Sequence, residues 1–443
     1  MSDSDSDYRL LQTLRGHHNA VNCVLFFQNG ELLVSGGDDQ CVRCWNISNS
    51  KCIQMLTEEH WGQVTALSLY EPQPDESGST VLFVGTSRGT VTAYPLSTGK
   101  QTFNAYAGVT ADVFVMNDSV ESQAVDPLNR RFVVGSHQGS VKMFDIVDGK
   151  LSEMPQWNLE LEDIPRSVIF YGNINRYIMI NTLYDGNSIN LEANVPDVSE
   201  EPENRKPVRI GTRQLQGSTG STVLSPDGTA MVVHNLRSDK FDVYKPLDAA
   251  LPILSLSVSE VHEDLFAKGA AFGEPGGRTL VCGGDNGHLH VYTLMGNHVQ
   301  TLKHKNDWST IYAVTTTVTQ DYYLIASAES LDPPKICIWA KETDERVIEK
   351  SLEREAQATQ AFLEAQAAKE AQKVQEAQAA QEAQMLEIVT LNRRYAFTLR
   401  ATLALIASGV ILIIWLWQRG TIIFHGGLSS DIWVTMAQSP PII

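Results

Sequence analysis

The sequence predicts an all-β repeat domain followed by a long α-helix and one transmembrane helix. Residues 8–341 repeat short apolar runs separated by Gly, Asn and Asp turns, a pattern typical of antiparallel strands. Residues 342–392 consist almost entirely of strong helix formers and contain no glycine or proline. Residues 395–418 are mostly apolar and contain no acidic side chain, which suits a lipid environment.

The first repeat unit, Leu14–Asn46, carries the clearest motif. A Gly-His pair precedes an expected strand at Val21–Phe27, and turns and two further strands follow up to a tryptophan. This unit resembles a WD repeat, in which four antiparallel strands form one blade of a β-propeller. A buried imidazole between a carboxylate and a hydroxyl would also satisfy polar groups that are costly inside a sheet. The resemblance implies a structural tetrad made of His17, Ser35, Asp39 and Trp45.

Six weaker copies follow at similar spacing. Most have lost the tetrad, because Arg88, Gln138 and Asn286 occupy the turn position of Asp39 in three of them. With the first unit they make seven, so the resemblance implies a seven-bladed WD-repeat β-propeller. Tyr8–Leu14 is expected to complete the last blade and leave no open sheet edge. The copies are expected at residues 64–96, 121–146, 165–193, 220–246, 268–294 and 311–341.

Cysteine and histidine pairs raise the alternative of a metal site. Cys41 and Cys44 have a spacing found among zinc ligands, but residues three apart on one strand point to opposite faces. We therefore favour structural thiols. His288 and His290 share one strand face and would supply half a metal site, but no third ligand is evident nearby. A partly exposed blade surface is the favoured interpretation, and no metal or cofactor is expected.

No catalytic motif is evident in the sequence. Residues 283–287 and 97–100 only superficially resemble phosphate loops, and both stand where turns between strands are expected. Ser225 belongs to a hairpin turn and is not the nucleophile of a G-x-S-x-G elbow. The chain is therefore not expected to be an enzyme.

Two polar segments each allow two interpretations. Residues 192–209 are acidic and contain proline, so they form either a long connection between blades four and five or a loop that binds a partner. The acidic residues 1–7 are expected to be a disordered tail, with an acid-directed kinase site as the alternative. Two sequons, at Asn46 and Asn117, would stay unmodified in the cytosol.

The segment 342–392 is expected to be a solvated stalk helix, which could reach roughly 75 Å at about 1.5 Å per residue. Its Glu-Ala-Gln triplets spread the glutamates around the helix. The best apolar stripe is alanine-rich and polar in its middle, so a coiled coil is not favoured. Self-association through the alanine face is the alternative.

The segment 395–418 is expected to span a membrane, because a propeller leaves no other apolar surface to cover it. A buried helix in a soluble domain is the alternative. The basic flanks place the N-terminal side in the cytosol, and the short tail 419–443 then crosses. The polar, acidic start argues against a signal peptide, and the short span favours the endoplasmic reticulum. The flanking residues are Arg393, Arg394 and Arg400 before the span and Arg419 after it.

These features predict a non-catalytic scaffold or adaptor on the cytosolic face of a membrane. The resemblance implies that proteins bind to the loop faces of the propeller, while lipid contacts the C-terminal helix. A net charge of -18 argues against nucleic acid. The alternative is a guanine-nucleotide exchange factor for the coat GTPase of the endoplasmic reticulum. That family carries an elongated loop in its first blade, whereas this sequence has a tight turn there.

Overall fold

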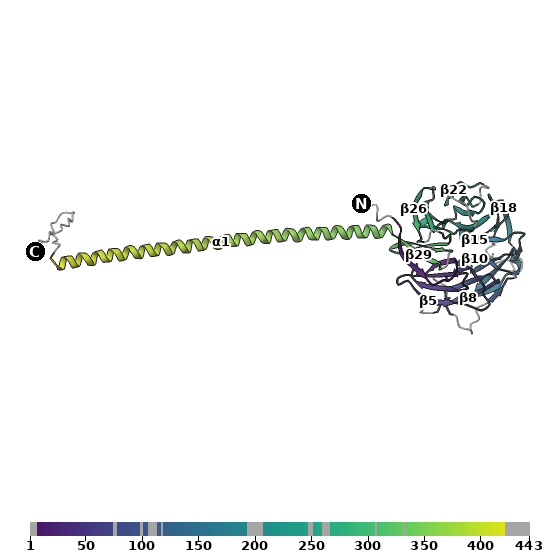
Figure 1. Cartoon of the computed structure of the whole chain (residues 1–443), viewed down its shortest axis with the longest axis horizontal. Helices are drawn as coiled ribbons and strands as arrows, with labels where there is room; N and C mark the ends of the chain where they lie inside the picture. Colours follow the sequence, from purple (N-terminus) through teal and green to yellow (C-terminus); the bar gives the residue numbers. More distant parts are fainter. Residues whose placement is uncertain are drawn as a thin grey trace. The chain divides into compact units, whose positions relative to one another are not determined.

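The computed structural model arranges seven antiparallel sheets in a ring, in chain order (Figure 1). We number the sheets as blades one to seven and letter the strands of each blade A to D. The A strands of neighbouring blades contact one another and therefore line the centre of the ring. The seven-bladed prediction is confirmed. The structure describes residues 7–73, 78–97, 101–104, 113–116, 118–192, 207–246, 251–258, 266–305, 308–330 and 333–420.

The first four blades each contain strands that follow one another along the chain. Blade one comprises β2 (Val21–Phe27), β3 (Leu32–Gly37), β4 (Val42–Asn46) and β5 (Lys51–Leu56). Blade two comprises β6 (Val64–Tyr70), β7 (Val81–Thr86), β8 (Thr90–Pro95) and β9 (Val113–Val115). Blade three comprises β10 (Val120–Asp126), β11 (Arg131–Ser136), β12 (Ser140–Val147), β13 (Lys150–Glu153) and the short β14 (Leu159–Glu160). Blade four comprises β15 (Pro165–Tyr171), β16 (Tyr177–Thr182), β17 (Asn187–Glu192) and β18 (Val208–Gln214).

The last three blades include the one that closes the ring. Blade five comprises β19 (Thr219–Leu224), β20 (Met231–Asn235), β21 (Lys240–Tyr244) and β22 (Leu254–Ser257). Blade six comprises β23 (Ala270–Gly273), β24 (Thr279–Gly283), β25 (His288–Thr293) and β26 (His298–Lys303). Blade seven comprises β27 (Ile311–Val318), β28 (Tyr322–Glu329), β29 (Lys335–Glu342) and β1 (Arg9–Arg15).

The B strands are the most apolar segments because neighbouring blades cover both of their faces. In β3, β7 and β11 every residue is buried, and the sequence there is a short continuous apolar run rather than an alternating one. Near the end of each of these strands lies a glycine, which leaves room for a side chain of the next blade. A Cβ on Gly36 would lie 2.4 Å from Cγ1 of Val64, and one on Gly85 would lie 2.7 Å from Cγ1 of Val120. A larger residue there would force the two blades apart.

The N-terminal strand closes the ring. β1 pairs antiparallel with β29, from Arg9 opposite Ala340 to Arg15 opposite Lys335. In Figure 1 the purple start of the chain lies beside the green β29. The prediction that this segment completes the last blade is confirmed. Tyr8 strengthens the closure, because its backbone N–H donates to Oε1 of Gln300 at 3.0 Å and its carbonyl accepts from Nε2 of the same residue at 2.9 Å.

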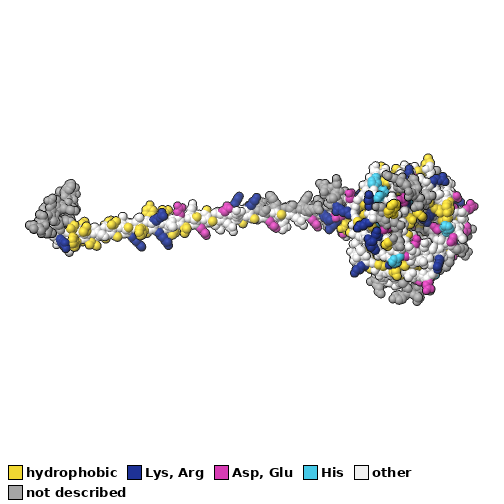
Figure 2. Space-filling model, in the orientation of Figure 1, with side chains coloured by type: hydrophobic (Ala, Val, Ile, Leu, Met, Phe, Trp, Pro, Cys, Tyr) yellow, Lys and Arg dark blue, Asp and Glu magenta, His cyan; other side chains and the backbone are white. Residues whose placement is uncertain are grey.

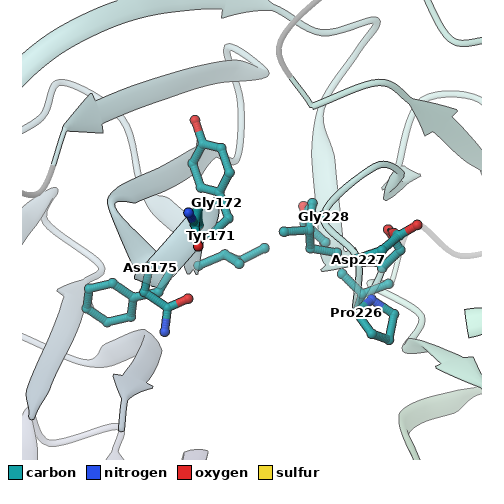
Figure 3. Close-up of a pocket in the computed structure, with 13 residues that line it drawn as sticks. Tyr171, Gly172, Asn175, Pro226, Asp227 and Gly228 are labelled. Atoms are coloured by element: carbon teal, nitrogen blue, oxygen red, sulfur yellow. The ribbon is translucent and has the colours of Figure 1, made fainter. Parts of the chain in front are cut away.

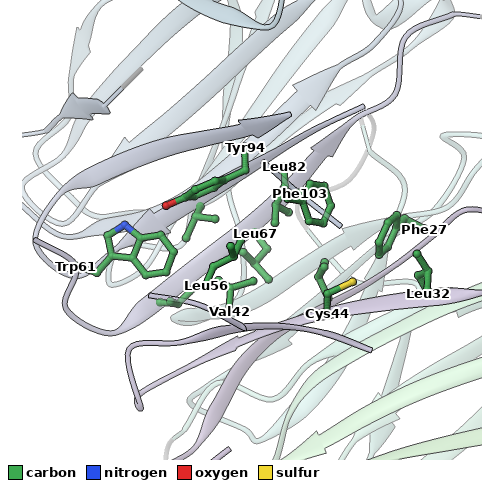
Figure 4. Close-up of a cluster of buried hydrophobic side chains, with 13 residues drawn as sticks. Phe27, Leu32, Val42, Cys44, Leu56, Trp61, Leu67, Leu82, Tyr94 and Phe103 are labelled. Carbon is green, nitrogen blue, oxygen red and sulfur yellow. The ribbon is translucent and has the colours of Figure 1, made fainter. Parts of the chain in front are cut away.

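Apolar seams between neighbouring blades form the core, and we name each seam by the two blades that it joins. Seam 1/2 is the largest and buries 13 hydrophobic side chains (Figure 4). In it the rings of Trp61 and Tyr94 meet edge to face, with their centroids 6.0 Å apart. Each seam covers one face of each of the two blades that it joins, so a blade is covered on both faces only by its two neighbours in the ring.

A single residue, Thr343, separates β29 from the long helix α1 (Asp344–Gln418). Thr343 caps it: its hydroxyl accepts from the backbone N–H of Arg346 at 3.3 Å and donates to the carbonyl of Gln320 at 3.0 Å. Asp344 and Glu345 in the first turn favour the positive end of the helix dipole. The first turn therefore leaves blade seven at its A–B hairpin.

The expected stalk and span are parts of one helix of 75 residues, because no glycine or proline occurs between residues 344 and 408. The 48-residue part Ala371–Gln418 contains a stretch of mean hydropathy 2.2 that is long and apolar enough to cross a membrane. In Figure 2 charged side chains are spread along the first part of the helix, and hydrophobic ones gather towards its C-terminal end.

Candidate interaction surface

The first blade contains a chain of hydrogen bonds that joins all four residues of the expected tetrad. The indole N–H of Trp45 donates to Oγ of Ser35 at 2.8 Å, and that hydroxyl lies 2.7 Å from Nε2 of His17. Nδ1 of His17 lies 2.9 Å from the carboxylate of Asp39. A neutral imidazole with its proton on Nδ1 satisfies every contact. The structure therefore brings the loop after β1, the strand β3 and the turn before β4 into one unit.

The environment of the tetrad suits a structural role. Burial alone would raise the pKa of Asp39, but the hydrogen bond from His17, the backbone N–H of His18 and the charge of Arg43 outweigh it and hold that pKa below its ordinary value. His17, Ser35 and Trp45 are all buried. The serine has its donor and acceptor capacity committed inside the blade, so it is not available to attack a substrate.

Blade seven contains a second tetrad, which the sequence analysis missed. Nε2 of His304 lies 2.8 Å from Oγ of Ser327, which also accepts the indole N–H of Trp339 at 2.9 Å. Nδ1 of His304 lies 3.3 Å from the carboxylate of Glu329. Burial raises the pKa of Glu329, but the adjacent imidazole of His304, followed by the charge of Lys335, outweighs it and lowers that pKa.

Two differences concealed this second tetrad. The acid is a glutamate two residues after its serine, whereas Asp39 comes four residues after Ser35. The longer side chain compensates for the earlier position. The histidine also follows a lysine and not a glycine, and it lies 23 residues before its serine, against 18 in blade one. The tetrad could have been found from Ser327 and Trp339, which lie on either side of a B–C turn as Ser35 and Trp45 do.

A different polar cluster connects blades five and six. His234 contacts Asp239 at 3.0 Å, and the fully buried Lys268 forms ion pairs with Asp239 and, at 2.9 Å, with Asp285. Burial raises the pKa of Asp239, but its bonds to His234 and Lys268 outweigh that effect and lower it. The lysine takes part in a network with two acids and therefore holds the two blades together.

The cysteine pair lies inside blade one. Cys44 is buried in seam 1/2 and Cys41 is partly buried at the start of the strand. Among the residues that the structure describes, no group of three or more His, Cys, Asp or Glu could hold a metal ion. Burial, followed by the nearby Cys52, raises the pKa of Cys44 to about 12, which opposes formation of a reactive thiolate.

The histidine pair has a third histidine as its neighbour. His288 and His290 on β25 lie on one face, and the ring centroid of His298 on β26 is 5.8 Å from that of His290. Burial, then the charges of His298 and His288, lowers the pKa of His290 to about 4. Its Nε2 has no hydrogen-bond partner within the described part of the chain. The ring of His290 is therefore neutral at neutral pH.

Other residues singled out in the sequence occupy turns, the terminal helix or regions outside the described ranges. The side chain of Asn46 accepts hydrogen bonds from Ser48 and Asn49 in the C–D hairpin of blade one. Of the loop 192–209, residues 193–206 lie outside the described residues, as do residues 1–6, Asn117 and residues 98–100. The arginines Arg393, Arg394 and Arg400 are exposed on α1, and the guanidinium of Arg419 lies 4.1 Å from the ring centroid of Trp415.

One end of the ring, which we call the top face, carries the D–A and B–C loops. There the central channel opens into a cavity of about 390 Å³, lined by residues from six blades. Glu121 and Arg166 form an ion pair of 3.0 Å in its wall, and the rings of Phe266 and Tyr312 lie 5.9 Å apart at its edge. The lining residues are Asn22, Asp38, Gln63, Thr65, Glu121, Arg166, Phe266, Ala267 and Tyr312.

The top face also exposes large aromatic side chains. Tyr184 is 69% exposed in the B–C loop of blade four, and Phe266 and Trp308 are 51% and 85% exposed in the loops that precede blades six and seven. Only one other aromatic side chain of the described propeller residues, Tyr322, is exposed, and it lies at the opposite end. Exposed aromatic residues around a cavity are typical of protein-binding surfaces.

The opposite end has a cleft of about 760 Å³ between the A–B hairpins of blades four and five (Figure 3). Tyr171 and Asn175 lie on one side, and Pro226 and Asp227 on the other. Hydrogen bonds from Ser225 and Thr229 lower the pKa of Asp227, so this carboxylate stays ionised near neutrality. In the cleft wall the hydroxyl of Ser225 donates to Asp227 at 2.6 Å and accepts from the backbone N–H of Ala230 at 2.9 Å, so both side chains stabilise the hairpin turn.

The arrangement of four-stranded blades, with buried His-Ser-acid-Trp tetrads in two of them, defines a β-propeller of the WD-repeat type. The family model "WD domain, G-beta repeat" matches residues 8–46, which form the closing strand and most of blade one. The chain therefore contains a WD repeat within a seven-bladed β-propeller. Proteins of this class are generally interaction scaffolds without catalytic activity.

The relatives share only part of this chain. Nuclear distribution protein nudF 1 of Talaromyces marneffei is 41% identical over 58 residues, which is 13% of this chain. Human DDB1- and CUL4-associated factor 5 is 33% identical over 140 residues, or 30% of this chain. Bovine pre-mRNA-processing factor 19 is 37% identical over 65 residues, or 15% of this chain. The match spans 13% of the length of each of these relatives.

The two serine-centred tetrads predict a large stability cost for a very small substitution. Ser35→Ala leaves the indole N–H of Trp45 and Nε2 of His17 buried without partners, so we expect it to lower the free energy of unfolding by about 2–4 kcal/mol. Ser327→Ala should cost a similar amount. Chemical denaturation measures both, with Ser48→Ala on an exposed turn as the control. Equal stability of Ser35→Ala and Ser48→Ala would contradict the structural role.

The histidine cluster predicts a loss of stability in mild acid. The unfolded chain binds a proton at this histidine below about pH 6.5, but folded His290, with its pKa of about 4, does not. The free energy of unfolding should therefore fall as pH drops from 6.5 towards 4, by about 1 kcal/mol between pH 7 and 5 once screening of the partly exposed ring is included. His290→Gln should remove this component, so the wild type should lose more stability than the variant over that interval. Parallel pH profiles for the two proteins would refute the assignment.

Proposed function

We propose that this protein is a non-catalytic scaffold that binds partner proteins through the top face of its propeller. The supporting observation is the placement of Tyr184, Phe266 and Trp308 on one face, two of them more than two-thirds exposed. Aromatic side chains supply a large contact area with little loss of conformational entropy, and they dominate binding energies at protein interfaces. The cavity at the channel mouth gives such a partner a recess to fill.

The start of α1 is compatible with this use of the top face. β29 is a C strand and ends at the opposite end of the ring, where Thr343 contacts the A–B hairpin of blade seven. The first turn of α1 is held there by an ion pair of 3.4 Å between Arg278 and Asp344. The first turn therefore does not compete with a partner for the top face.

The C-terminal part of α1 is proposed to anchor the scaffold in a membrane, with the propeller in the cytosol and the endoplasmic reticulum as the favoured location. The apolar stretch within Ala371–Gln418 supports this, because none of its side chains is covered by protein. Arg393, Arg394 and Arg400 would lie at the cytosolic headgroups, and Trp415 and Trp417 at the far interface. Self-association of α1 along its stalk part is a further proposal, supported by the exposed Met385 and Leu386.

The exchange-factor alternative gains no support. Only four residues, Asp38–Cys41, separate β3 from β4 in the first blade. The elongated loop that such a factor carries in this blade has no counterpart in this turn.

The top face can be tested by labelling neighbours in cells. A biotin ligase is fused to the N-terminus of the full chain, and biotinylated neighbours are compared between the wild type and a variant with Tyr184→Ala and Trp308→Ala. Each removed aromatic anchor should cost about 1–2 kcal/mol of binding free energy. Labelling of the main partners should therefore fall roughly tenfold or more. The matched control is Leu128→Ala with Met295→Ala, two exposed side chains at the other end. An unchanged set of neighbours for the top-face variant, at equal expression and thermal stability, would rule out this face as the binding site.

The membrane anchor is tested separately by alkaline carbonate extraction. The full-length protein should stay in the membrane pellet, and replacing Ile406 and Ile413 by Glu should release it, because each charge at the centre of a span costs several kcal/mol. The same number of added charges at Gln372 and Gln375, which lie outside the apolar stretch, should have no effect. Wild-type protein in the supernatant would exclude the anchor, and a glycan on Asn46 would exclude the cytosolic orientation.

A further inference from the structure

The seam between blades four and five has the smallest apolar core of the ring. Each of the other six seams buries between nine and 13 hydrophobic side chains among the described residues, whereas seam 4/5 buries six. Apolar burial is the main attraction between blades, so this pair is held least strongly by it. The six are Tyr171, Met179, Leu215, Met231, Val233 and Tyr244.

Polar side chains replace the missing apolar ones in this seam. Asn181 is fully buried, and its Nδ2 donates across the seam to Oγ1 of Thr222 at 3.2 Å. Within the described residues its Oδ1 has no hydrogen-bond partner, and neither has the buried hydroxyl of Ser188. Tyr171 donates its phenolic hydrogen to Asn190 at 2.9 Å. Each unpaired buried group costs about 1–3 kcal/mol, a cost that water would remove if the seam opened.

The A–B hairpins of blades four and five, which border the cleft, each contact the blade on their other side. Asn175 of blade four donates to Asp126 of blade three at 2.7 Å, and Asn129 of blade three donates to the carbonyl of Ile174 at 2.9 Å. The hairpin of blade five packs the other way, since a Cβ on Gly277 of blade six would lie 2.9 Å from Pro226. Figure 3 shows the two sides separated by the cleft. At the hairpins of blades three and four, by contrast, the two hydrogen bonds join the blades directly.

Polar contacts also cross seam 4/5. Nε of Arg166 donates to the carbonyl of Gly220 at 2.9 Å, and Nη1 of Arg213 donates to the carbonyl of Lys245 at 2.8 Å. The hydroxyl of Ser218 donates to the carbonyl of Tyr184 at 3.3 Å. Water can replace such bonds at a small net cost, whereas apolar surface cannot be exposed so cheaply.

We propose that the ring opens locally at seam 4/5 while the closure between β1 and β29 stays paired. The N-terminal closure looks like the weak point, because it joins distant ends of the chain. It is nevertheless flanked by seams 7/1 and 6/7, which bury 11 and ten hydrophobic side chains. Opening at seam 4/5 widens the existing cleft and needs no strand to leave its own blade. It is therefore the opening of lowest cost.

Two adjacent valines on β20 allow a matched test. Val233 faces seam 4/5 and Val232, on the opposite strand face, belongs to seam 5/6, and both are buried. Val233→Cys and Val232→Cys are made separately in the full-length protein, and reaction with a maleimide is followed by peptide mass spectrometry under native conditions. The thiol at position 233 should react roughly tenfold faster than the thiol at position 232. The native cysteines Cys282 in seam 5/6 and Cys337 in seam 6/7 are internal controls.

A second variant separates opening of the seam from damage by the new cysteine. Adding Asn181→Leu and Thr222→Val to Val233→Cys replaces the polar contact and the unpaired Oδ1 of Asn181 by apolar surface, so labelling at position 233 should slow by about fivefold or more. The same pair added to Val232→Cys should leave that rate unchanged. Equal labelling at positions 232 and 233, or faster labelling of Cys337 than of position 233, would overturn the proposal.

Discussion

The structure depends on ring closure, because every blade is apolar on both faces. Strands such as β3 and β7 are buried along their whole length, so both faces of their blades need a cover. If the blades formed an open row, the first and the last blade would each expose one apolar face to water. The ring removes the ends, and the pairing of β1 with β29 holds them together. The distribution of apolar residues along the chain, the early position of the closing strand and the glycines where blades approach closely all serve this constraint.

Polar groups are also buried near the top face, where the chain gathers them into networks of three kinds. Blade one uses histidine, serine, aspartate and tryptophan, and blade seven replaces the aspartate by Glu329. Blades five and six use Lys268 between two acids instead. Each network ties a loop of the top face to the strands below it. The exposed aromatic residues are thus carried by loops next to rigid elements, which reduces the entropy lost on binding.

The sequence was sufficient for the strands and the blade number because the burial of B strands leaves a strong signal of short apolar runs between turns. It was sufficient for the first tetrad because Gly-His and the spacing to Trp45 are both present. It was not sufficient for Glu329, since the longer side chain reaches the histidine from a different position. Nor could it show that Trp308 and Tyr184 are exposed, because exposure in a loop depends on neighbours far away in the chain. The sequence analysis divided residues 342–418 into a stalk and a span because their compositions differ. In the structure one uninterrupted helix runs through both parts.

Because the seams differ in apolar burial, the proposed opening occurs at one seam, and that seam divides the proposed binding face. Tyr184 belongs to blade four, whereas Phe266 and Trp308 precede blades six and seven. Seam 4/5 therefore lies between the first aromatic anchor and the other two. A partner that contacts all three would hold blades four and five together, and separation of the blades would weaken its grip without disturbing any tetrad. The same polar contacts that make this seam the easiest to open thus link the conformation of the ring to the occupancy of its top face.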